Sequence, residues 1–244
     1  LLDRRSLRSV ENKAGLPAWV KSLSETACAL LIESTAASNS LLLQQLDHIR
    51  NVMQAFTLEQ QVDFSTDPEV YNQLWAIRKG TFPAVGAVRK IGTTVIIEDV
   101  TFPLEQLAEG VSRLQQLFDK YYYTEAIIFG QALEGNLHFV FTQGFDDATQ
   151  VARYEAFMQE VATMVAGEFG GSLKAEHGTG RNMAPFVELE WGQEAYQLMW
   201  QLKKLLDPAN ILNPDVVLSH NPRLHLQNLK PLPATNPLVD KCIE

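Results

Sequence analysis

The sequence has little cysteine, no run of basic residues and no long apolar segment. Its 244 residues contain two cysteines, Cys28 and Cys242, which lie far apart in the sequence. This usage argues against a structural disulfide and fits a reducing compartment. No apolar run approaches the roughly 20 residues that a membrane-spanning helix needs. The first residues also lack the apolar segment of a signal peptide. We therefore expect neither a transmembrane segment nor a secretory signal.

Positive charge is also scarce, and several nucleotide and nucleophile motifs are missing. The net charge of −9, without any basic stripe, argues against nucleic-acid binding. No Gly-x-Gly-x-x-Gly turn, Walker-type phosphate loop or Gly-x-Ser-x-Gly elbow occurs, so no nicotinamide site, P-loop or serine nucleophile is indicated. Cys28 lies in an apolar run, where a thiol is inert, so we expect no cysteine nucleophile.

The length and composition indicate one sizeable globular domain with shorter flanking segments. An apolar fraction of 46% is sufficient for a core. Residues 1–26 are polar and mixed, and we expect a connector from a preceding domain. Residues 27–207 form the main domain. Residues 208–244 contain six of the eleven prolines and no periodicity, which predicts an extended linker. The start at Leu1 and the cysteine near the end lead us to expect a piece of a longer polypeptide.

Apolar periodicity predicts alternating strands and helices. Helices are expected at 40–55, 67–80, 103–118, 146–169 and 185–206, and strands at 28–33, 58–64, 93–99, 126–129, 137–142 and 173–175. From residue 93 onward the order is strand, helix, strand, strand, helix, strand, which is the split βαβ unit of ferredoxin-like folds. The earlier elements suggest a second, degenerate copy. The predicted fold class is α+β, an antiparallel sheet with helices on one face.

The stretch 172–181 carries the most chemistry. Glu176 and His177 follow a short predicted strand, and Gly178 and Gly180 then permit a tight turn. A carboxylate and an imidazole together at a strand end, with Arg181 just beyond, suit acid–base or metal chemistry on an anion. The alternative is a glycine-rich turn whose polar side chains are merely solvated. These residues alone favour neither interpretation.

A second candidate is the loop and strand 130–138. The loop exposes Gln131, Glu134 and Asn136, and alternation places His138 on the face opposite Phe139. Taken alone, such a histidine is more often a hydrogen-bonded strand residue than a ligand. Convergence with Glu176 and His177 would provide enough imidazole and carboxylate groups for a divalent metal.

Arg78 is a third candidate, at the predicted end of the helix 67–80. A guanidinium there can bind a substrate carboxylate in a bidentate fork. The alternative is an ordinary cation at a helix C-terminus, where positive charge is favoured.

These motifs resemble a known family. Residues 130–138 resemble the Gly-His-x-Gly-Asp-Gly-Asn-Leu-His motif of the FAD-linked oxidase C-terminal domain. That domain occurs in the D-lactate dehydrogenase, D-2-hydroxyglutarate dehydrogenase and glycolate oxidase group of the vanillyl-alcohol oxidase superfamily. Residues 175–180 and 206–214 resemble its second and closing motifs, so the resemblance covers about 27–218. The tail around Cys242 is similar to the start of a ferredoxin-type cysteine run, as in the large YdiJ-type proteins with flavin and iron–sulfur modules.

The resemblance implies a role for individual residues. His177 matches the base that takes the substrate's hydroxyl proton, and Cys242 matches the first ligand of a 4Fe–4S cluster. The remaining implied roles are substrate binding for Arg78, His138 and Arg181, contact with the flavin for Glu134, Asn136 and Asn213, and metal binding for His138, Glu176 and Gln131. Gln131 stands where the family has a histidine, which makes it the poorer ligand. Asp215 stands where a glycine usually follows the last motif.

The implied function is the substrate-binding domain of an FAD-dependent D-2-hydroxy-acid dehydrogenase. FAD would be bound mainly by a preceding domain, with zinc or manganese at the site and a 4Fe–4S cluster in a following domain. The expected partners are a small 2-hydroxy acid and those two domains, and a homo-oligomer remains open. The alternatives are a metal-dependent hydrolase that uses His138, Glu176 and His177, and a non-catalytic ferredoxin-like assembly module. We expect a cytoplasmic protein, with membrane association through an electron-acceptor partner left open, and little activity from this segment alone.

Overall fold

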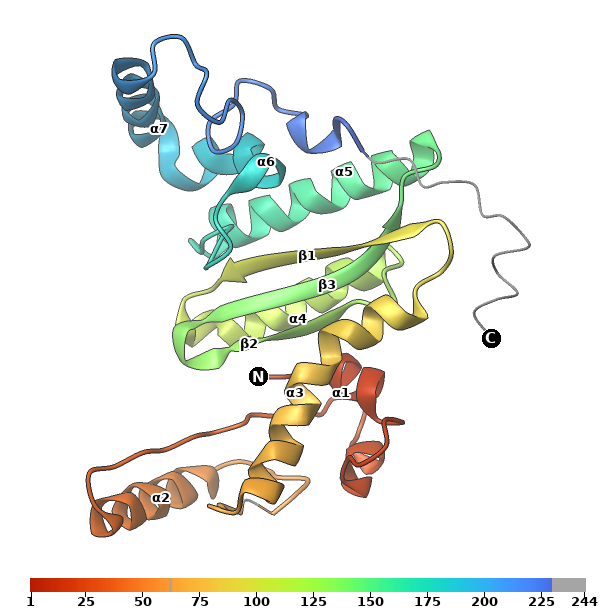
Figure 1. The fold of residues 1–244 in the computed structure, drawn as a ribbon, viewed down its shortest axis with the longest axis vertical. Helices are drawn as coiled ribbons and strands as arrows, with labels where there is room; N and C mark the ends of the chain where they lie inside the picture. Colours follow the sequence, from red (N-terminus) through yellow and green to blue (C-terminus); the bar gives the residue numbers. More distant parts are fainter. Residues whose placement is uncertain (62, 230–244) are drawn as a thin grey trace. The chain divides into compact units, whose positions relative to one another are not determined.

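The chain consists of two compact units, Leu1–Ala84 and Val85–Glu244 (Figure 1). The computed structural model describes residues 1–61 and 63–229. Within these residues, no helix combines the length and the apolar character that crossing a lipid bilayer would require. The candidate site lies in the second unit, which is therefore described first.

The second unit is built on a three-stranded antiparallel sheet. Its strands are β1 (Thr93–Thr101), β2 (Ile127–Gln131) and β3 (Asn136–Gly144), in the order β1-β3-β2, with β3 in the middle (Figure 1). Both pairs are antiparallel. The three strands fall where the alternation and the β-branched residues predicted them, and the α+β class is confirmed.

The fourth predicted strand, 173–175, does not form in the structure. It is reduced to one antiparallel bridge between Ser172 and Thr101 of β1. Beyond Ser172 the backbone donors bond to side chains: the Leu173 N–H donates to Glu190, and the N–H groups of Glu176 and His177 donate to Asp99. Since a ladder requires those donors, the strand ends after a single residue pair.

Helices cover one face of this sheet. They are α4 (Leu107–Lys120) and α5 (Ala148–Ala162), and α5 continues as a π-helical turn, Thr163–Glu168. Phe118 of α4 lies 5.8 Å from Phe139, and Phe157 of α5 lies 5.1 Å from Phe141, between ring centroids. The alternate residues of β3, including His138, therefore point to the opposite face, as predicted.

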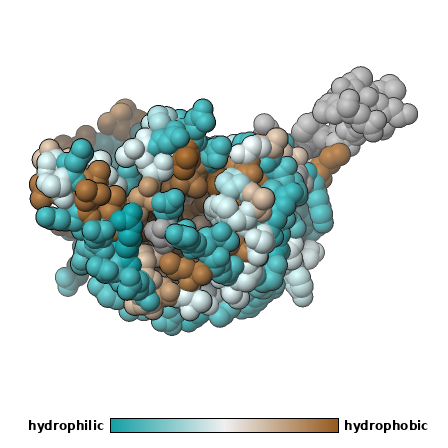
Figure 2. Space-filling model, turned by 90° about the horizontal axis from the view of Figure 1, so that it is seen from below, coloured by the Kyte–Doolittle hydropathy of each residue, from teal (hydrophilic) through white to brown (hydrophobic). Residues whose placement is uncertain are grey.

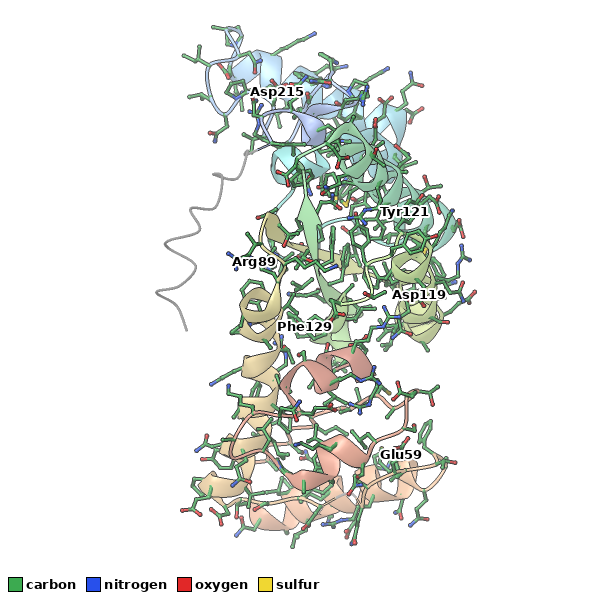
Figure 3. The ribbon with its side chains drawn as sticks, turned by 90° about the vertical axis from the view of Figure 1, so that its right-hand side faces the viewer. Glu59, Arg89, Asp119, Tyr121, Phe129 and Asp215 are labelled. Atoms are coloured by element: carbon green, nitrogen blue, oxygen red, sulfur yellow. The ribbon has the colours of Figure 1, made fainter. Side chains whose placement is uncertain are left out.

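The rest of the unit is helical or irregular. It contains α6 (Gly180–Met183), α7 (Val187–Leu206) and the short 3₁₀ turns Leu104–Gln106, Ala132–Glu134, Ala184–Phe186 and Leu224–Leu226. Residues 208–229 differ from the expected extended linker, because Leu224 and His225 are buried. The Tyr196 hydroxyl donates to the Ser219 carbonyl at 2.7 Å and fastens this segment to α7. Asp215 lies in the same segment (Figure 3).

The first unit contains α1 (Arg4–Val10), a 3₁₀ turn (Ala18–Ser22), α2 (Asn39–Met53) and most of α3 (Pro68–Val88). Residues 1–26 are thus partly helical rather than a plain connector, and Leu7 and Val10 are buried. In the described residues neither 28–33 nor 58–64 is a strand; Ala29 makes only an isolated bridge with Leu2. The described residues therefore do not form the expected second copy of the βαβ unit.

Apolar side chains in the first unit remain at the surface. Leu30, Leu43 and Phe56 are more than half exposed, and α2 has no buried residue. Figure 2 shows apolar residues among hydrophilic ones on the face that it presents. Cys28 is also exposed, which contradicts the expected burial of its thiol in a strand. An apolar run forms a buried strand only when a neighbouring strand pairs with it, and none of the described residues does so beyond Leu2.

Helix α3 extends past its predicted end at Gly80. It continues through Pro83 to Val88. A Cβ at Gly80 would lie 3.2 Å from the Lys13 ammonium, so this glycine lets the Lys13 side chain approach the helix closely and does not end the helix. Arg78 therefore lies inside α3, and the helix-terminus explanation for its charge is wrong.

The first prediction concerns Gly135, between β2 and β3. Its φ is +68°, and a Cβ there would lie 2.1 Å from the Phe102 carbonyl oxygen. Gly178 has a φ of +74° but open space around it. We expect Gly178→Ala to lower the free energy of unfolding by about 1 kcal/mol through backbone strain alone. Gly135→Ala should lower it at least about twice as much, because the backbone must also move. Equal losses in urea unfolding would contradict the close contact.

The second prediction concerns Asp207, at the end of α7. Its carboxylate accepts the N–H groups of Ile211 and Leu212 and the Lys203 ammonium. The Lys203 bond first, and then these amides, lower its pKa from 3.8 to about 2. Because a lowered pKa stabilises the fold only while the group is ionised, this contribution is present above about pH 4 and is lost as the pH falls through about 2.

Asp207→Asn should therefore unfold at a lower temperature than the native chain at pH 7, and the difference should shrink between about pH 4 and pH 2. Asp146→Asn, at an exposed aspartate, is the control and should change little. Thermal unfolding followed by circular dichroism at several pH values measures both. A difference that stays constant with pH would contradict the role of the ionised Asp207.

Candidate active site

The structure brings together three residues from the two sequence motifs. Glu176 Oε1 lies 2.7 Å from His138 Nε2. The rings of His138 and His177 lie edge to face, with their centroids 4.8 Å apart and an interplanar angle of 84°. One ligand atom from each of the three residues lies within 4.8 Å of the other two. The two motifs therefore converge, which is the condition that a metal site required, and we call these residues the His138 cluster.

Different elements position the three side chains. His138 projects from the middle of β3, opposite Asp99 of β1 and Phe129 of β2, and is buried. Glu176 and His177 come from the irregular segment after the Ser172 bridge, and their side chains are 46% and 40% exposed. The cluster thus combines one rigid imidazole with two groups that remain accessible to a small molecule.

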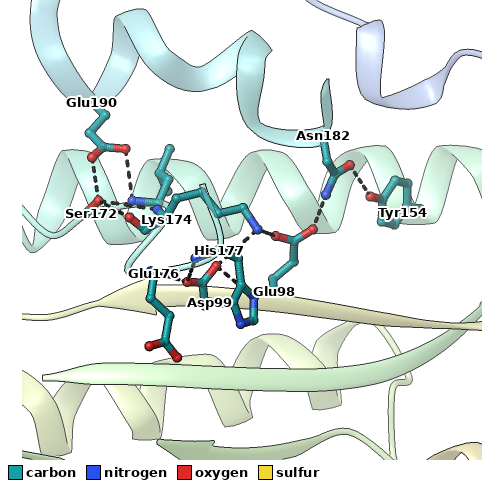
Figure 4. A network of polar contacts seen from close by, with 10 residues as sticks. Glu98, Asp99, Tyr154, Ser172, Lys174, Glu176, His177, Asn182 and Glu190 are labelled. Atoms are coloured by element: carbon teal, nitrogen blue, oxygen red, sulfur yellow. Dashed lines mark hydrogen bonds and ion pairs between the residues drawn. The ribbon is translucent and has the colours of Figure 1, made fainter. Parts of the chain in front are cut away.

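Asp99 holds the segment that carries Glu176 and His177. Its Oδ2 accepts the N–H of Glu176 at 2.6 Å and that of His177 at 2.9 Å (Figure 4). Burial opposes ionisation of this carboxyl, but the two amide donors and the Lys174 ammonium outweigh it and hold its pKa below the usual range. Asp99 is therefore a buried carboxylate that is charged at neutral pH.

Lys174 links Asp99 to a second buried carboxylate. Its Nζ lies 2.5 Å from Glu98 Oε2 and 3.2 Å from Asp99 Oδ1. Glu98 also accepts from Asn182, which in turn accepts from the Tyr154 hydroxyl (Figure 4). Burial raises the pKa of Glu98, and the bonds to Lys174 and Asn182 offset this only in part. Glu98 and Asp99 are neighbours in β1 and point to opposite faces of the sheet, so the Lys174 ammonium pairs with one carboxylate on each face.

Glu190 of α7 fixes the start of the same segment. It accepts from the Ser172 hydroxyl at 2.7 Å and from the Leu173 N–H at 3.0 Å. After His177, Gly178 and Gly180 adopt φ values of +74° and +64°, which the left-handed turn requires. The bonds to Glu190 and Asp99 thus fix the backbone just before this glycine turn.

The other predicted site residues are less closely grouped. Asn136 lies on the same face of β3 as His138, and its Oδ1 is buried without a hydrogen-bond partner in the described residues. Gln131 and Glu134 are exposed. Arg181 donates to the Pro214 carbonyl at 3.3 Å, which brings it beside the Asn213 segment. Arg78 belongs to the unit Leu1–Ala84, and Cys242 lies outside the described residues.

The residue types of the His138 cluster fit a divalent metal. Two imidazoles and one carboxylate are the ligand types that zinc and manganese accept. Their ligand atoms lie within 4.8 Å of one another, close enough to share one ion. Gln131, the other predicted ligand, shares the His138 face through its pairing with Asn136.

A comparison with known families decides the relationship. Residues 1–217 match the family described as FAD linked oxidases, C-terminal domain. The chain belongs to this family. The resemblance inferred from the three motifs is therefore confirmed, and the match includes residues 1–26, which the motifs did not reach.

Several curated proteins are similar to this C-terminal domain. It is 28% identical over 224 residues to the glycolate oxidase subunit GlcD of Bacillus subtilis, covering 91% of this chain and 45% of that protein. It is 35% identical over 152 residues to the mitochondrial D-lactate dehydrogenase [cytochrome] of Arabidopsis thaliana, covering 62% and 26%. It is 30% identical over 200 residues to a probable mitochondrial D-2-hydroxyglutarate dehydrogenase of Oryza sativa subsp. indica, covering 78% and 32%. The chain thus spans less than half the length of these relatives.

The sequence did not identify the buried charged network beside the His138 cluster. Its members are Glu98, Asp99 and Lys174. The available signal was an adjacent acidic pair inside an otherwise apolar strand, Thr93–Thr101, because a charge in a buried strand requires a partner. The partner, Lys174, could not be identified from spacing, since it lies 76 residues further along the chain.

The third prediction concerns Lys174→Met. Without the ammonium, two buried carboxylates lose their counter-charge, and the free energy of unfolding at pH 7 should fall by roughly 3–5 kcal/mol. Burial already raises the pKa of Glu98, and without the ammonium that pKa would lie still further above its unfolded value. The loss should therefore shrink as the pH is lowered and Glu98 takes up a proton.

Lys120→Met is the matched control, since the Lys120–Glu160 pair is largely exposed and should contribute less than about 1 kcal/mol. Denaturant unfolding at pH 7 and pH 5 measures both variants. Similar losses of unfolding free energy in the two variants would contradict the role of Lys174 as the counter-charge of two buried carboxylates.

Proposed function

We propose that this chain is the substrate-binding part of an FAD-dependent D-2-hydroxy-acid dehydrogenase. The observation that carries the proposal is the His138 cluster, in which both family motifs meet in one accessible group. Membership of the FAD-linked oxidase family supports the flavin. The named relatives include a glycolate oxidase subunit, a D-lactate dehydrogenase and a D-2-hydroxyglutarate dehydrogenase, which support a 2-hydroxy acid as the class of substrate.

In this proposal His177 is the base. The substrate's hydroxyl proton moves to the His177 imidazole as the O–H bond breaks and the carbonyl of the 2-oxo acid forms. The electron pair of the α-carbon's C–H bond leaves as hydride, and the flavin, when bound, supplies the acceptor for that hydride. Imidazole suits proton uptake near neutral pH, and a side chain that is 40% exposed is accessible to a small acid.

His138 and Glu176 are proposed as metal ligands, with Gln131 as a weaker third. A zinc or manganese ion, when bound, would polarise the substrate's hydroxyl and carboxylate. The buried His138 ring is held in place by the Phe129 ring on β2, with 5.4 Å between the ring centroids. His177 lies near enough to act as a further ligand, so its assignment as the base requires a test that separates metal binding from turnover.

Asn136, with Glu134 and Asn213, is proposed to contact the flavin. The buried Asn136 Oδ1 has no partner in the described residues, and an unpaired buried acceptor indicates a donor supplied from elsewhere. This observation fits a polar group of a bound flavin on the His138 face. Arg78 and Arg181 are proposed to bind the substrate carboxylate, because a guanidinium forms two parallel hydrogen bonds with it.

The surroundings of the chain are part of the same proposal. Residues 27–207 would form the substrate domain, with a flavin domain before them and a 4Fe–4S domain after them that includes Cys242. The expected location is the cytoplasm, with contact to an electron acceptor. The chain covers 45% of the glycolate oxidase subunit and 26% of the D-lactate dehydrogenase, so more than half of each relative lies outside the matched region.

The fourth prediction tests these roles in the flavoprotein that contains this chain. Its flavin absorbance should bleach, without oxygen, on addition of D-lactate or D-2-hydroxyglutarate. His177→Ala should slow this reduction by about 10²- to 10⁴-fold, as expected for a lost general base. By calorimetry the same variant should still bind zinc or manganese, whereas Glu176→Gln should bind it more weakly.

His48→Ala is the matched control, because His48 is exposed in α2 and should have no effect. A flavin that no 2-hydroxy acid reduces would contradict the dehydrogenase. Loss of metal binding in His177→Ala would instead make His177 a ligand. Metal-dependent hydrolysis without flavin would favour the hydrolase.

A further inference from the structure

Asp99 contacts the site at three points, although neither sequence motif contains it. Its Oδ2 accepts the backbone N–H groups of Glu176 and His177, and its Oδ1 lies 3.5 Å from His177 Nδ1. The side chain is fully buried in β1, directly opposite His138 in the strand register. One rigid carboxylate therefore contacts both the backbone and the ring of His177 (Figure 4).

The position of Asp99 also selects the tautomer of His177. A neutral imidazole carries one proton, on Nδ1 or on Nε2. A proton on Nδ1 faces the negative Asp99 Oδ1, whereas a lone pair there would face the same charge unfavourably. The tautomer with the proton on Nδ1 is therefore favoured, and Nε2, across the ring, keeps its lone pair.

We propose that Asp99 is the positioning residue of this site: it fixes the backbone of residues 176–177 and holds His177 with its proton on Nδ1. Nε2 is then the atom that accepts the substrate's hydroxyl proton. This last step rests on the proposed function, whereas the tautomer does not. In serine hydrolases and in metal sites, an aspartate orients a functional histidine in the same way and acts through that histidine.

Glu98 provides a matched comparison within the same strand. It is also buried and also bonds to Lys174, but it points to the opposite face and bonds to Asn182 rather than to Glu176 or His177. Glu98→Gln therefore alters a neighbouring buried carboxylate without altering any contact to His177. Its turnover should stay within a few-fold of the native value.

The test begins with the native flavoprotein labelled with ¹⁵N-histidine. Long-range ¹H–¹⁵N spectra report which ring nitrogen of His177 carries the proton, and the His177→Gln variant identifies its signals. The expected result is a proton on Nδ1. A proton on Nε2 in the native protein would overturn the proposal, and this measurement needs no Asp99 variant.

The second arm uses Asp99→Asn. Its carbonyl oxygen can still accept the two amides, so its NH₂ group would face His177 Nδ1 and move the ring proton to Nε2. The expected turnover falls about 10²- to 10⁴-fold, with KM changed only a few-fold. Adding Asp99→Asn to His177→Ala should cause no further loss. An unchanged tautomer, or independent losses in the double variant, would contradict the proposal.

The outcomes also separate this inference from the proposed function. A flavoprotein that oxidises 2-hydroxy acids but has the proton on Nε2 would overturn the role of Asp99 alone. A protein with the proton on Nδ1 that oxidises none of these acids would overturn the proposed function, and the positioning of His177 by Asp99 would stand.

Discussion

The buried charge of Asp99 constrains the structure around it. A carboxylate with no solvent exposure must find donors inside the fold, and Asp99 finds them in two backbone amides and the Lys174 ammonium. Those amides belong to residues that the sheet topology places beside the free edge of β1. Because they are bonded to Asp99, they cannot pair with β1. The same two hydrogen bonds to Asp99 therefore prevent the fourth strand and position the site residues Glu176 and His177.

The same constraint explains why a single lysine lies between two carboxylates. Glu98 and Asp99 point to opposite faces of β1, and only a residue beside the edge of that strand can reach both. The Ser172 bridge stops after one pair and leaves room there for the flexible Lys174 side chain. Glu190 fixes the start of this segment from α7, so residues 172–177 are held at both ends by acidic side chains.

Local pattern predicted the sheet of the second unit and, in the first unit, helix α2 and the start of α3, but not the absence, among the described residues, of the two strands expected there. Alternation in β3 predicted the face on which His138 lies, because a strand buried on both faces still alternates between two environments. The run 28–33 has the same composition as a strand, but a strand also needs a partner, and pairing is a non-local property. Glu176 and His177 were found through their motif. Asp99 was not, because an acid in a strand is read as solvent-facing until the amides of residues 176 and 177 are placed beside it.

The composition of the site also bears on specificity. The relatives are named for glycolate, D-lactate and D-2-hydroxyglutarate, acids that share a hydroxyl group next to a carboxylate and differ in the remaining substituent. Under the proposed function, the His138 cluster and Asp99 act only on the shared part. The substituent must then be recognised by residues outside this cluster. One arrangement of histidine, glutamate and buried aspartate can therefore serve acids of different size, and a change of substrate would require no change in the residues that accept the proton.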